Sequence, residues 1–398
     1  MGDGPRVREV LLKDGRDRSP RRRHPWVLSG AVSDEPGSGA AGELVRVLAS
    51  SGEVLGHGHY SPASQIRVRL TAFGKEAPAA GWLGDRIRSA ASHRASDPLL
   101  AGTDAVRLVN AEGDGLPGLV VDRYADVAVV RIATVGMSAA RAEIGGALFE
   151  HAGVRTVFER ADAVAARRDA FAPHSGVLAG APLAGPVAID ERGRHYQVDT
   201  AAGQKTGFYL DQRDARDLVQ RLASGRRVLD LFSYTGGFAA AAARGGATAV
   251  TAVDSSAEAL ESARAHVAAN TEKPGTCAAE FVTGDAFQFV RDTREEWDLL
   301  LVDPPPLARR RGDVTKASRA YKDVVLHALR RARPGAHLLA FRCSHHMSSD
   351  LFRKIVFGAS LDAGRSLRVL ATLGAPTDHP VSLDHPEGEY LSGLLLRA

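Results

Sequence analysis

The sequence predicts an α/β protein in which a doubly wound, mostly parallel sheet follows a small β-rich domain and a small α+β unit. Three observations lead to this prediction. Apolar runs alternate with helical stretches from residue 227 onward, the first run ends in a turn with two adjacent glycines, and short runs separated by Gly, Ser and Pro precede it. At 398 residues the chain exceeds what one core usually supports. We therefore divide it into residues 1–80, 81–186 and 187–398.

The composition, with 44% hydrophobic and 25% charged residues, is that of an ordinary soluble protein. No uninterrupted apolar run approaches the ~20 residues that a membrane helix needs. We therefore expect a cytoplasmic protein without membrane contact. The two cysteines, Cys277 and Cys343, cannot form a disulfide framework or a closed zinc site. We expect two reduced thiols and no bound metal.

The N-terminal stretch carries most of the clustered positive charge. From Arg6 to Arg23 there are eight basic residues against three acids, and His24-Pro25-Trp26 follows. Such a stretch is either a solvated arm or a surface that contacts phosphates beside an aromatic ring. In the second case the RNA-binding residues would be Arg21, Arg22, Arg23 and Trp26.

Three short runs after this stretch, residues 44–48, 54–60 and 65–70, predict the strands of the β-rich domain. The size and position of this domain resemble those of a PUA domain, a compact β-barrel used by RNA-modifying enzymes. The details that match are Arg23 to Val27, Ser29 to Ala31 and Tyr60 to Ile66.

The middle of the chain predicts a small α+β unit. Residues 82–100 form a linking helix, and strands at 106–109, 119–123, 127–132 and 156–159 accompany a helix at 139–151. The acidic turn from Glu112 to Gly118 suits a hairpin better than a metal loop, because it is rich in Gly and Pro. Residues 170–186 are rich in Ala, Gly and Pro and are expected to form a connector.

The central motif is the run Val228 to Leu231, which a turn with Gly236 and Gly237 joins to an Ala-rich helical stretch. A dinucleotide site would need G-x-G-x-x-G to hold a pyrophosphate, and this turn lacks it. A ligand with adenosine and ribose but no phosphate fits better, and S-adenosylmethionine is such a ligand. Asp230 would then lie near its charged tail, Asp254 on the ribose hydroxyls and Asp285 on the adenine amino group. A simple tight turn is the alternative interpretation.

A hairpin at 187–189 and 195–200 leads into the block from Gly203 to Arg216, which combines a Gly-bounded turn, two aromatics and alternating charge. Phe208 could pack against the cofactor and Arg213 could pair with its carboxylate. Alternatively, the block is a capped helix start with Phe208 in the core.

Asp303 and Cys343 follow the apolar runs 297–302 and 336–341, at the strand ends where sites form in such sheets. If the two strands are neighbours, they lie about 4.8 Å apart. A thiolate that attacks carbon 6 of a pyrimidine makes carbon 5 able to accept a methyl group, and Asp303 could hydrogen-bond N3. Enzymes that methylate a base amine typically place an aromatic after Asp-Pro-Pro, where this chain has Pro306. A lone cysteine that ends a strand is, however, often a small core residue.

The chain resembles class I S-adenosylmethionine-dependent methyltransferases of the bacterial ribosomal RNA large subunit methyltransferase I family, whose members make 5-methylcytosine in 23S rRNA. The matching motifs span nearly the whole chain: Arg23 to Trp26, Tyr60 to Ile66, Gly113 to Pro117, Lys205 to Arg213, Phe232 to Phe238, Asp303 to Pro305, Tyr321 to Asp323, Cys343-Ser344, Ser349 to Phe352, Asp378 to Pro380 and Pro386 to Gly388.

The resemblance implies a PUA domain, a central α/β domain and a Rossmann-like methyltransferase domain, often paired as a homodimer. It implies Cys343 as the nucleophile. Asp303, the acid expected at N3, is the second candidate catalytic residue. The residues expected to bind the cofactor are Thr206, Gly207, Phe208, Arg213, Asp230, Tyr234, Gly236, Gly237, Asp254 and Asp285. The family usually has Lys at Pro306 and often His at Gln204. We expect Arg309, Arg310 and Arg311 to restore positive charge for RNA phosphates.

Two other functions remain open from the sequence. An S-adenosylmethionine-dependent enzyme that methylates another base, an amine or a small molecule would not need Cys343. A non-catalytic RNA-binding factor would keep the basic stretch and the β-rich domain without turnover.

Overall fold

The computed structural model describes residues 8–273, 275–308, 310–344 and 346–398. The chain forms two compact units. The first comprises Met1–Ile189, Val198–Phe208 and Thr377–Gly388, and the second comprises Asp190–Gln197, Tyr209–Pro376 and Glu389–Ala398. The chain therefore leaves the second unit after Gln197 and Pro376, and it re-enters that unit at Tyr209 and Glu389.

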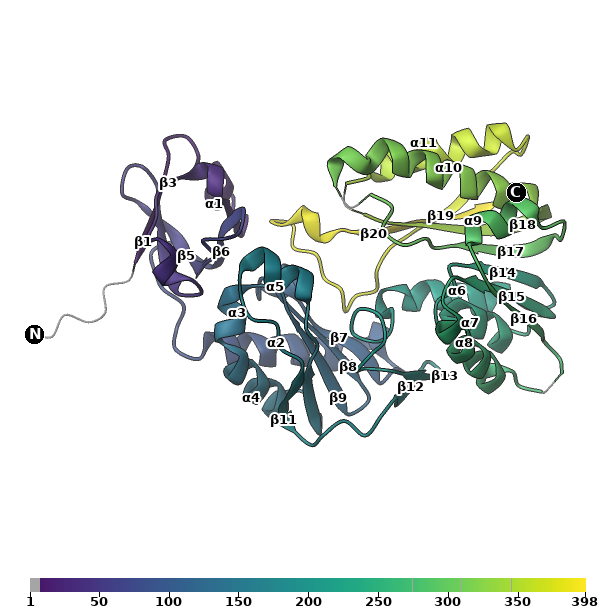
Figure 1. The fold of residues 1–398 in the computed structure, drawn as a ribbon, viewed down its shortest axis with the longest axis horizontal. Helices are drawn as coiled ribbons and strands as arrows, with labels where there is room; N and C mark the ends of the chain where they lie inside the picture. The colour runs from purple at the N-terminus through teal and green to yellow at the C-terminus, as the bar shows by residue number, and fades with distance from the viewer. Residues whose placement is uncertain (1–7, 274, 309, 345) are drawn as a thin grey trace, which may run out of the picture. The chain divides into compact units, whose positions relative to one another are not determined.

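The N-terminal part of the first unit, drawn in purple in Figure 1, is a six-stranded sheet with strand order β2-β6-β5-β4-β1-β3. Its pairings are antiparallel except for the parallel pair β1 and β4. Alternate residues such as Val45 and Val47 are fully buried, as expected for strands with one face on a core. The elements are β1 (Glu9–Leu12), α1 (Arg18–Arg21), β2 (Trp26–Leu28), β3 (Val32–Asp34), β4 (Leu44–Leu48), β5 (Val54–Tyr60) and β6 (Ile66–Phe73).

The remainder of the first unit is built on a five-stranded sheet with order β11-β10-β9-β8-β7. Buried side chains of α2 and α4, among them Ile87 and Leu148, share one core with the sheet. The elements are α2 (Trp82–Ser96), β7 (Ala105–Asn110), β8 (Leu119–Tyr124), β9 (Val127–Ile132), α3 (Val135–Ala139), α4 (Arg141–His151), β10 (Thr156–Glu159), α5 (Ala163–Asp169) and β11 (Gly176–Gly180).

One expectation for this region is wrong. Residues 170–186 are not only a connector, because β11 lies within them and pairs antiparallel with β10. The strand Gly-Val-Leu-Ala-Gly is short and begins and ends with glycine, so its local sequence has little strand propensity. Pairing with β10 decides its conformation.

The second unit contains a seven-stranded sheet with order β16-β15-β14-β17-β18-β20-β19. The first five of these strands are parallel, and β20 runs antiparallel to both of its neighbours. The strands are β14 (Arg227–Leu231), β15 (Ala249–Asp254), β16 (Ala278–Thr283), β17 (Trp297–Val302), β18 (Ala332–Cys343), β19 (Arg368–Leu373) and β20 (Leu391–Arg397). The strand order reverses between β14 and β17, which is where open α/β sheets bind their ligands.

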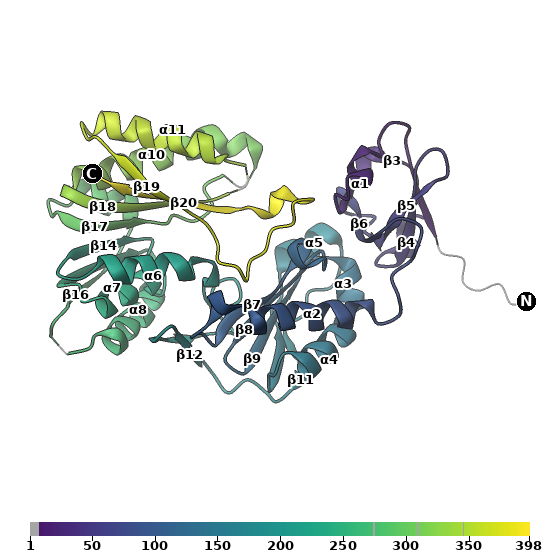
Figure 2. The same cartoon turned by 180° about the vertical axis from the view of Figure 1, so that it is seen from behind.

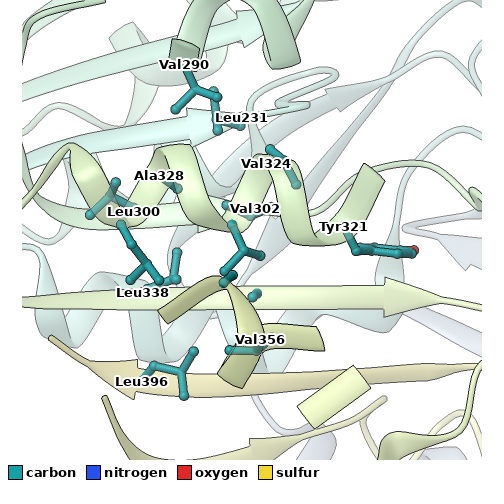
Figure 3. Close-up of a cluster of buried hydrophobic side chains, with 14 of the residues drawn as sticks. Leu231, Val290, Leu300, Val302, Tyr321, Val324, Ala328, Leu338, Val356 and Leu396 are labelled. Atoms are coloured by element: carbon teal, nitrogen blue, oxygen red, sulfur yellow. The ribbon is translucent and has the colours of Figure 1, made fainter. Parts of the chain in front are cut away.

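Helices cover both faces of this sheet, because its strands are apolar on both sides. Val228 and Leu299 pack with α6 (Arg213–Leu222), α7 (Gly237–Arg244) and α8 (Ala257–Asn270). Leu231 and Leu300 face the opposite core, which contains side chains of α9 (Ala286–Asp292), α10 (Val314–Arg330) and α11 (Ser349–Asp362). Figure 3 shows this second core, and Figure 2 shows the two helical layers from behind.

This architecture confirms the predicted α/β fold class, with a doubly wound sheet preceded by a β-rich and an α+β part. A hairpin of β12 (Val187–Glu191) and β13 (Arg194–Val198) precedes the block that leads into α6. Within the described parts of the chain, no helix has the length and apolar character that crossing a bilayer requires.

Candidate active site

Asp303 and Cys343 lie together at the carboxyl edge of the second unit's sheet. Strands β17 and β18 are parallel neighbours, with Val302 opposite Ala340. Asp303 directly follows β17, and Cys343 is the last residue of β18. The Cys343 thiol donates a hydrogen bond to Oδ1 of Asp303, with 3.7 Å between sulfur and oxygen. The two strands are neighbours, and they place an acid beside a thiol.

The second oxygen of Asp303 has a partner that the sequence did not suggest. The Gln212 amide nitrogen donates to Oδ2 of Asp303 over 2.8 Å, and the Gln212 residue is only 3% exposed. Next to it, the Tyr390 hydroxyl donates to Oδ2 of Asp211 over 2.6 Å. In the sequence, Asp211 and Tyr390 closely follow Tyr209 and Glu389, the residues at which the chain re-enters the second unit. The only sequence signal was the Asp-Gln pair just before α6.

Tyrosines surround the acid and the thiol. The Tyr209 and Tyr234 rings meet edge to face with centroids 5.6 Å apart, and Tyr321 is fully buried against Phe352. Burial raises the pKa of Tyr209, and the nearby charges of Asp211, Asp303 and the Cys343 thiolate raise it further. Burial likewise raises the pKa of Tyr321. Both phenols are therefore neutral at physiological pH.

Asp230, near the end of β14, is a buried carboxyl group. Its Oδ2 accepts from the Ala239 backbone N–H over 3.0 Å, while its Oδ1 has no hydrogen-bond partner among the described residues. Burial raises the pKa of Asp230 to about 8, and the neighbouring carboxylates of Asp303 and Asp254 add to this shift. A buried acceptor without a partner is costly unless a ligand supplies the missing donor or positive charge.

A pH-dependent stability follows from Asp230. Between about pH 4 and pH 8 the unfolded chain carries this carboxylate ionised, whereas the folded protein retains its proton. Rising pH therefore favours the unfolded state at this site. We expect the Tm of the Asp230→Asn protein, measured without cofactor, to gain several degrees relative to the native protein as pH rises through this window, since about 1 kcal/mol shifts Tm by about 2–4 °C in a domain of this size.

The control for this measurement is Asp350→Asn, which removes a carboxyl group whose side chain is 74% exposed. A Tm difference between the Asp230→Asn and native proteins that stays constant from pH 4 to pH 8 would contradict the assigned shift. Burial of the new amide group changes the Tm by the same amount at every pH. It therefore does not affect how the Tm difference between the two proteins varies with pH.

The turn after β14 has an unusual backbone. Phe232 and Tyr234 adopt positive φ values of 63° and 49°, in the left-handed region that non-glycine residues rarely occupy. Asp254 holds this turn, since its carboxylate accepts from the backbone N–H groups of Tyr234 and Ser256, each over 2.9 Å. Such strain concentrates at functional sites.

The two glycines of the turn, Gly236 and Gly237, have different structural roles. A Cβ on Gly236 would lie 2.6 Å from the Ala263 Cβ of α8, so glycine is required there for the packing of α7 on α8. Gly237 is the first residue of α7. Asp285 caps α9, where its Oδ1 accepts from the backbone N–H groups of Phe287 and Gln288 over 2.7 and 3.2 Å.

Arg213 lies in a buried ionic cluster. Its side chain is fully buried, and its Nε lies 3.7 Å from Oε2 of Glu191. Arg194 and Arg216 also donate to this glutamate, over 3.0 and 2.7 Å to Oε1. Burial by itself would raise the pKa of Glu191, but the guanidinium groups of Arg216, Arg194 and Arg213 lower it to about 2. The cluster joins the hairpin to the start of α6.

Thr206, Gly207 and Phe208 belong to the first unit. The Thr206 hydroxyl donates to Asp122 over 2.6 Å, and the Phe208 backbone N–H donates to the Tyr124 hydroxyl over 3.2 Å. Gly207 has a φ of 134°, and a Cβ there would lie 2.6 Å from the Val198 side chain. The segment is thus held by β8 through its side chains and backbone.

The predicted RNA-contacting residues differ in their surroundings. Arg21 is exposed and pairs with Asp17 and Glu53 over 2.7 and 2.6 Å. Trp26 is half-buried, and its indole N–H donates to Glu112 over 2.8 Å. The Arg23 guanidinium carbon lies 5.6 Å from the centroid of the Phe73 ring.

The remaining predicted RNA-binding residues are Arg22, Arg310 and Arg311, which are exposed, and Arg309, which lies outside the described residues. The part of the chain that the structure describes contains no group of three His, Cys, Asp or Glu side chains that could hold a metal ion.

Two family models match the chain. A model for S-adenosylmethionine-dependent methyltransferases covers residues 162–387, and a model for PUA-like domains covers residues 10–73. The first extends over more than half of the sequence. It includes the strand ends that carry Asp230, Asp303 and Cys343.

Curated relatives match over nearly the full length. The ribosomal RNA large subunit methyltransferase I of Shewanella denitrificans is 40% identical over 393 residues, which is 98% of both chains. The protein of the same name from Citrobacter koseri is 38% identical over 98% of this chain and 99% of its own.

The fold itself has a solved counterpart. SMU.776, a proposed methyltransferase crystallised with SAH, superposes with a TM-score of 0.82 at 23% identity over 98% of this chain and 100% of its own. At that identity the structural similarity shows only the fold. The family is shown by the curated relatives and the two domain models. The chain belongs to the ribosomal RNA large subunit methyltransferase I family, whose members are S-adenosylmethionine-dependent methyltransferases with a PUA-like domain.

Proposed function

We propose that this protein methylates carbon 5 of a cytosine in 23S rRNA through a covalent adduct between Cys343 and carbon 6 of the ring. The observation that carries the proposal is the thiol of Cys343 hydrogen-bonded to Asp303 over 3.7 Å at the carboxyl edge of the sheet. Methylation of a base amine needs no such thiol, because the amine is already a nucleophile. Carbon 5 becomes nucleophilic only after carbon 6 has been attacked.

The residues around β14 fit S-adenosylmethionine. The Oδ1 of Asp230 is a buried acceptor that has no hydrogen-bond partner among the described residues, and this suits the positively charged end of the cofactor. Asp254 lies at the end of the next strand, where such folds hold ribose hydroxyls. When bound, the cofactor supplies an electrophilic methyl group. The other residues that we propose for its site are Thr206, Gly207, Phe208, Arg213, Tyr234, Gly236, Gly237 and Asp285.

Asp303 serves two steps in this proposal. A free cysteine with a pKa of about 8.5 is only slightly ionised at neutral pH, so Asp303 acts here as a general base that takes the thiol proton as the carbon–sulfur bond forms. The sulfur adds to carbon 6 of the cytosine. The protonated Asp303 donates to N3 and thereby stabilises the charge that the addition delivers to the ring.

The remaining steps restore the aromatic ring. Carbon 5 takes the methyl group, and a base or water removes the carbon 5 proton. The carbon–sulfur bond then breaks with its electron pair on sulfur, which frees Cys343, and N3 returns its proton to Asp303. The neutral phenols of Tyr209 and Tyr321 add no negative charge beside the thiolate. They therefore do not oppose its formation.

RNA contact is proposed for the basic residues of the first unit and for the stretch after Asp303. Exposed cations such as Arg22 and Arg310 would neutralise phosphates, so RNA binding should weaken as salt rises. Arg21, Arg23, Trp26, Arg309 and Arg311 complete the proposed set. Pairing of two copies into a homodimer is a further expectation from the family.

A mechanism-based trap tests this function. RNA that carries 5-fluorocytosine at the target position should form an adduct with the protein that survives denaturation, because fluorine at carbon 5 cannot leave as the proton does. We expect the adduct only when S-adenosylmethionine is present for the methyl transfer that completes it. Mass spectrometry should place the RNA on the peptide that contains Cys343, and 5-methylcytidine should be the product with unmodified RNA.

A product methylated on a base amine, or an adduct that never forms although the RNA is methylated, would overturn the proposal. RNA binding without any methyl transfer would instead indicate a non-catalytic factor.

A further inference from the structure

The orientation of the Gln212 side chain is determined by its neighbour. Its amide group lies 2.8 Å from Oδ2 of Asp303, and a carboxylate oxygen can only accept a hydrogen bond. The amide nitrogen must therefore face Asp303. The amide oxygen, Oε1, consequently faces away from that carboxylate and is left as an acceptor.

This acceptor has no partner within the described residues. Oε1 of Gln212 is buried and makes no hydrogen bond, and the residue as a whole is only 3% exposed. Nearly all buried polar groups in proteins are hydrogen-bonded, and an unsatisfied one costs about 1–3 kcal/mol. The amide oxygen is buried and has no donor among the described residues, and its own side chain contacts Asp303. Together these observations point to a ligand that supplies the donor.

The surrounding contacts hold Gln212 in place. It closes the short 3-10 turn Leu210–Gln212 that leads into α6. The preceding Asp211 is anchored by the Tyr390 hydroxyl over 2.6 Å, and the next residue, Arg213, belongs to the buried cluster around Glu191. Side chains fixed by such neighbours are preorganised for selective recognition.

The chemistry of a pyrimidine matches this pair of side chains. In cytosine the ring nitrogen N3 and the exocyclic amine on carbon 4 are neighbours, and the amine is a hydrogen-bond donor. In uracil the corresponding group is a carbonyl oxygen, which an amide oxygen repels. Asp303 at N3 with an acceptor beside it therefore selects cytosine.

We propose that Gln212 is the residue that selects the base, with its Oε1 accepting a hydrogen bond from the 4-amino group of the target cytosine. This inference rests on the proposed function, since it assumes that Asp303 addresses N3 of the same ring. It adds the group that distinguishes cytosine from other pyrimidines. It also explains why a buried amide oxygen has no partner among the residues that the structure describes.

The test compares two RNA oligonucleotides that differ only at the target, one with cytosine and one with pyrimidin-2-one, which lacks the amine. Single-turnover rates of methyl transfer are measured for the native protein and for Gln212→Met, which is close in size but has no acceptor. We expect the preference for cytosine over pyrimidin-2-one to fall about tenfold in the variant, the size of one hydrogen bond to a substrate amine. The rate ratio of cytosine to pyrimidin-2-one in the native protein is divided by the same ratio in the variant. The difference in intrinsic reactivity between the two bases cancels in this quotient.

Two variants serve as controls. Gln288→Met removes another glutamine amide that donates to a carboxylate, that of Asp292 over 2.7 Å, and it should leave the preference unchanged. Gln212→Glu keeps an acceptor but loses the donor to Asp303. It should react more slowly with both RNAs and retain the preference for cytosine. This variant also tests the proposal if the Gln212→Met protein does not fold.

The outcomes separate the two hypotheses. A role of Gln212 only in holding Asp303 would slow both RNAs equally, and an unchanged preference would overturn the proposal. The 5-fluorocytosine trap is run on the same native preparation. Its failure would remove the proposed function itself, whereas an unchanged preference with normal trapping would count against Gln212 alone.

Discussion

Replacement of Cys343 by alanine is expected to abolish RNA methylation, with a rate loss on the order of a thousandfold or more, as for the nucleophiles of other covalent enzymes. In the proposed mechanism, carbon 5 of the ring has no other route to nucleophilic character. Binding of RNA should be retained, because the basic residues are unchanged. Transfer of labelled methyl groups to RNA, with a binding assay in parallel, measures both properties.

The chain provides a matched control for this experiment. Cys277 is the other cysteine, it is partly buried beside the core of α6 to α8, and burial raises the pKa of its thiol. Cys277→Ala should therefore leave methylation intact. Methylation by the Cys343→Ala protein at a rate within tenfold of the native rate would show that the thiol is not the nucleophile.

Replacement of Glu191 by glutamine is expected to destabilise the second unit by about 3–5 kcal/mol, because it leaves buried arginines without their common carboxylate. Glu191 and Arg213 are fully buried, and Arg194 and Arg216 are 1% and 2% exposed. Denaturant unfolding measures this loss. Asp190→Asn is the control, since its side chain is 43% exposed at the neighbouring position.

The same cluster predicts an acid dependence of stability. The pKa of Glu191 is lowered to about 2 in the folded protein, below its usual value of 4.5. The stability that it contributes is complete above about pH 4.5 and is lost as pH falls toward 2. The Glu191→Gln protein should lack this part of the acid transition. If the Glu191→Gln protein has the same unfolding free energy as the native protein, the cluster contributes no net stability.

Several features of the site were already predictable from local sequence. Asp230 lies near the end of an apolar run and Asp303 and Cys343 follow such runs, and parallel strands place these residues at one edge of a sheet. The structure pairs β17 with β18 and brings Asp303 within hydrogen-bonding distance of Cys343. From the sequence, the acid and the thiol were predicted as neighbours on the condition that their two strands pair.

Other contacts could not be predicted in this way. Gln212 reaches Asp303 across 91 positions of sequence, and Tyr390 reaches Asp211 across 179. The sequence suggested Arg213 as a partner for a cofactor carboxylate, but it did not indicate that Glu191 also lies 3.7 Å from the Arg213 side chain. A charge pattern shows that a residue needs a partner, but several partners of the same chemistry are available along the chain.

By itself, then, the sequence determined the α/β class, the alternation of strands and helices between β14 and β18 and the strand ends at which Asp303 and Cys343 lie, because apolar periodicity and glycine turns act over a few residues. Only the tertiary structure decided which polar groups meet. β11 forms through pairing with β10, and Gln212 presents a buried acceptor through its bond to Asp303. Hydrogen-bond partners depend on how distant segments pack, and local patterns do not encode that geometry.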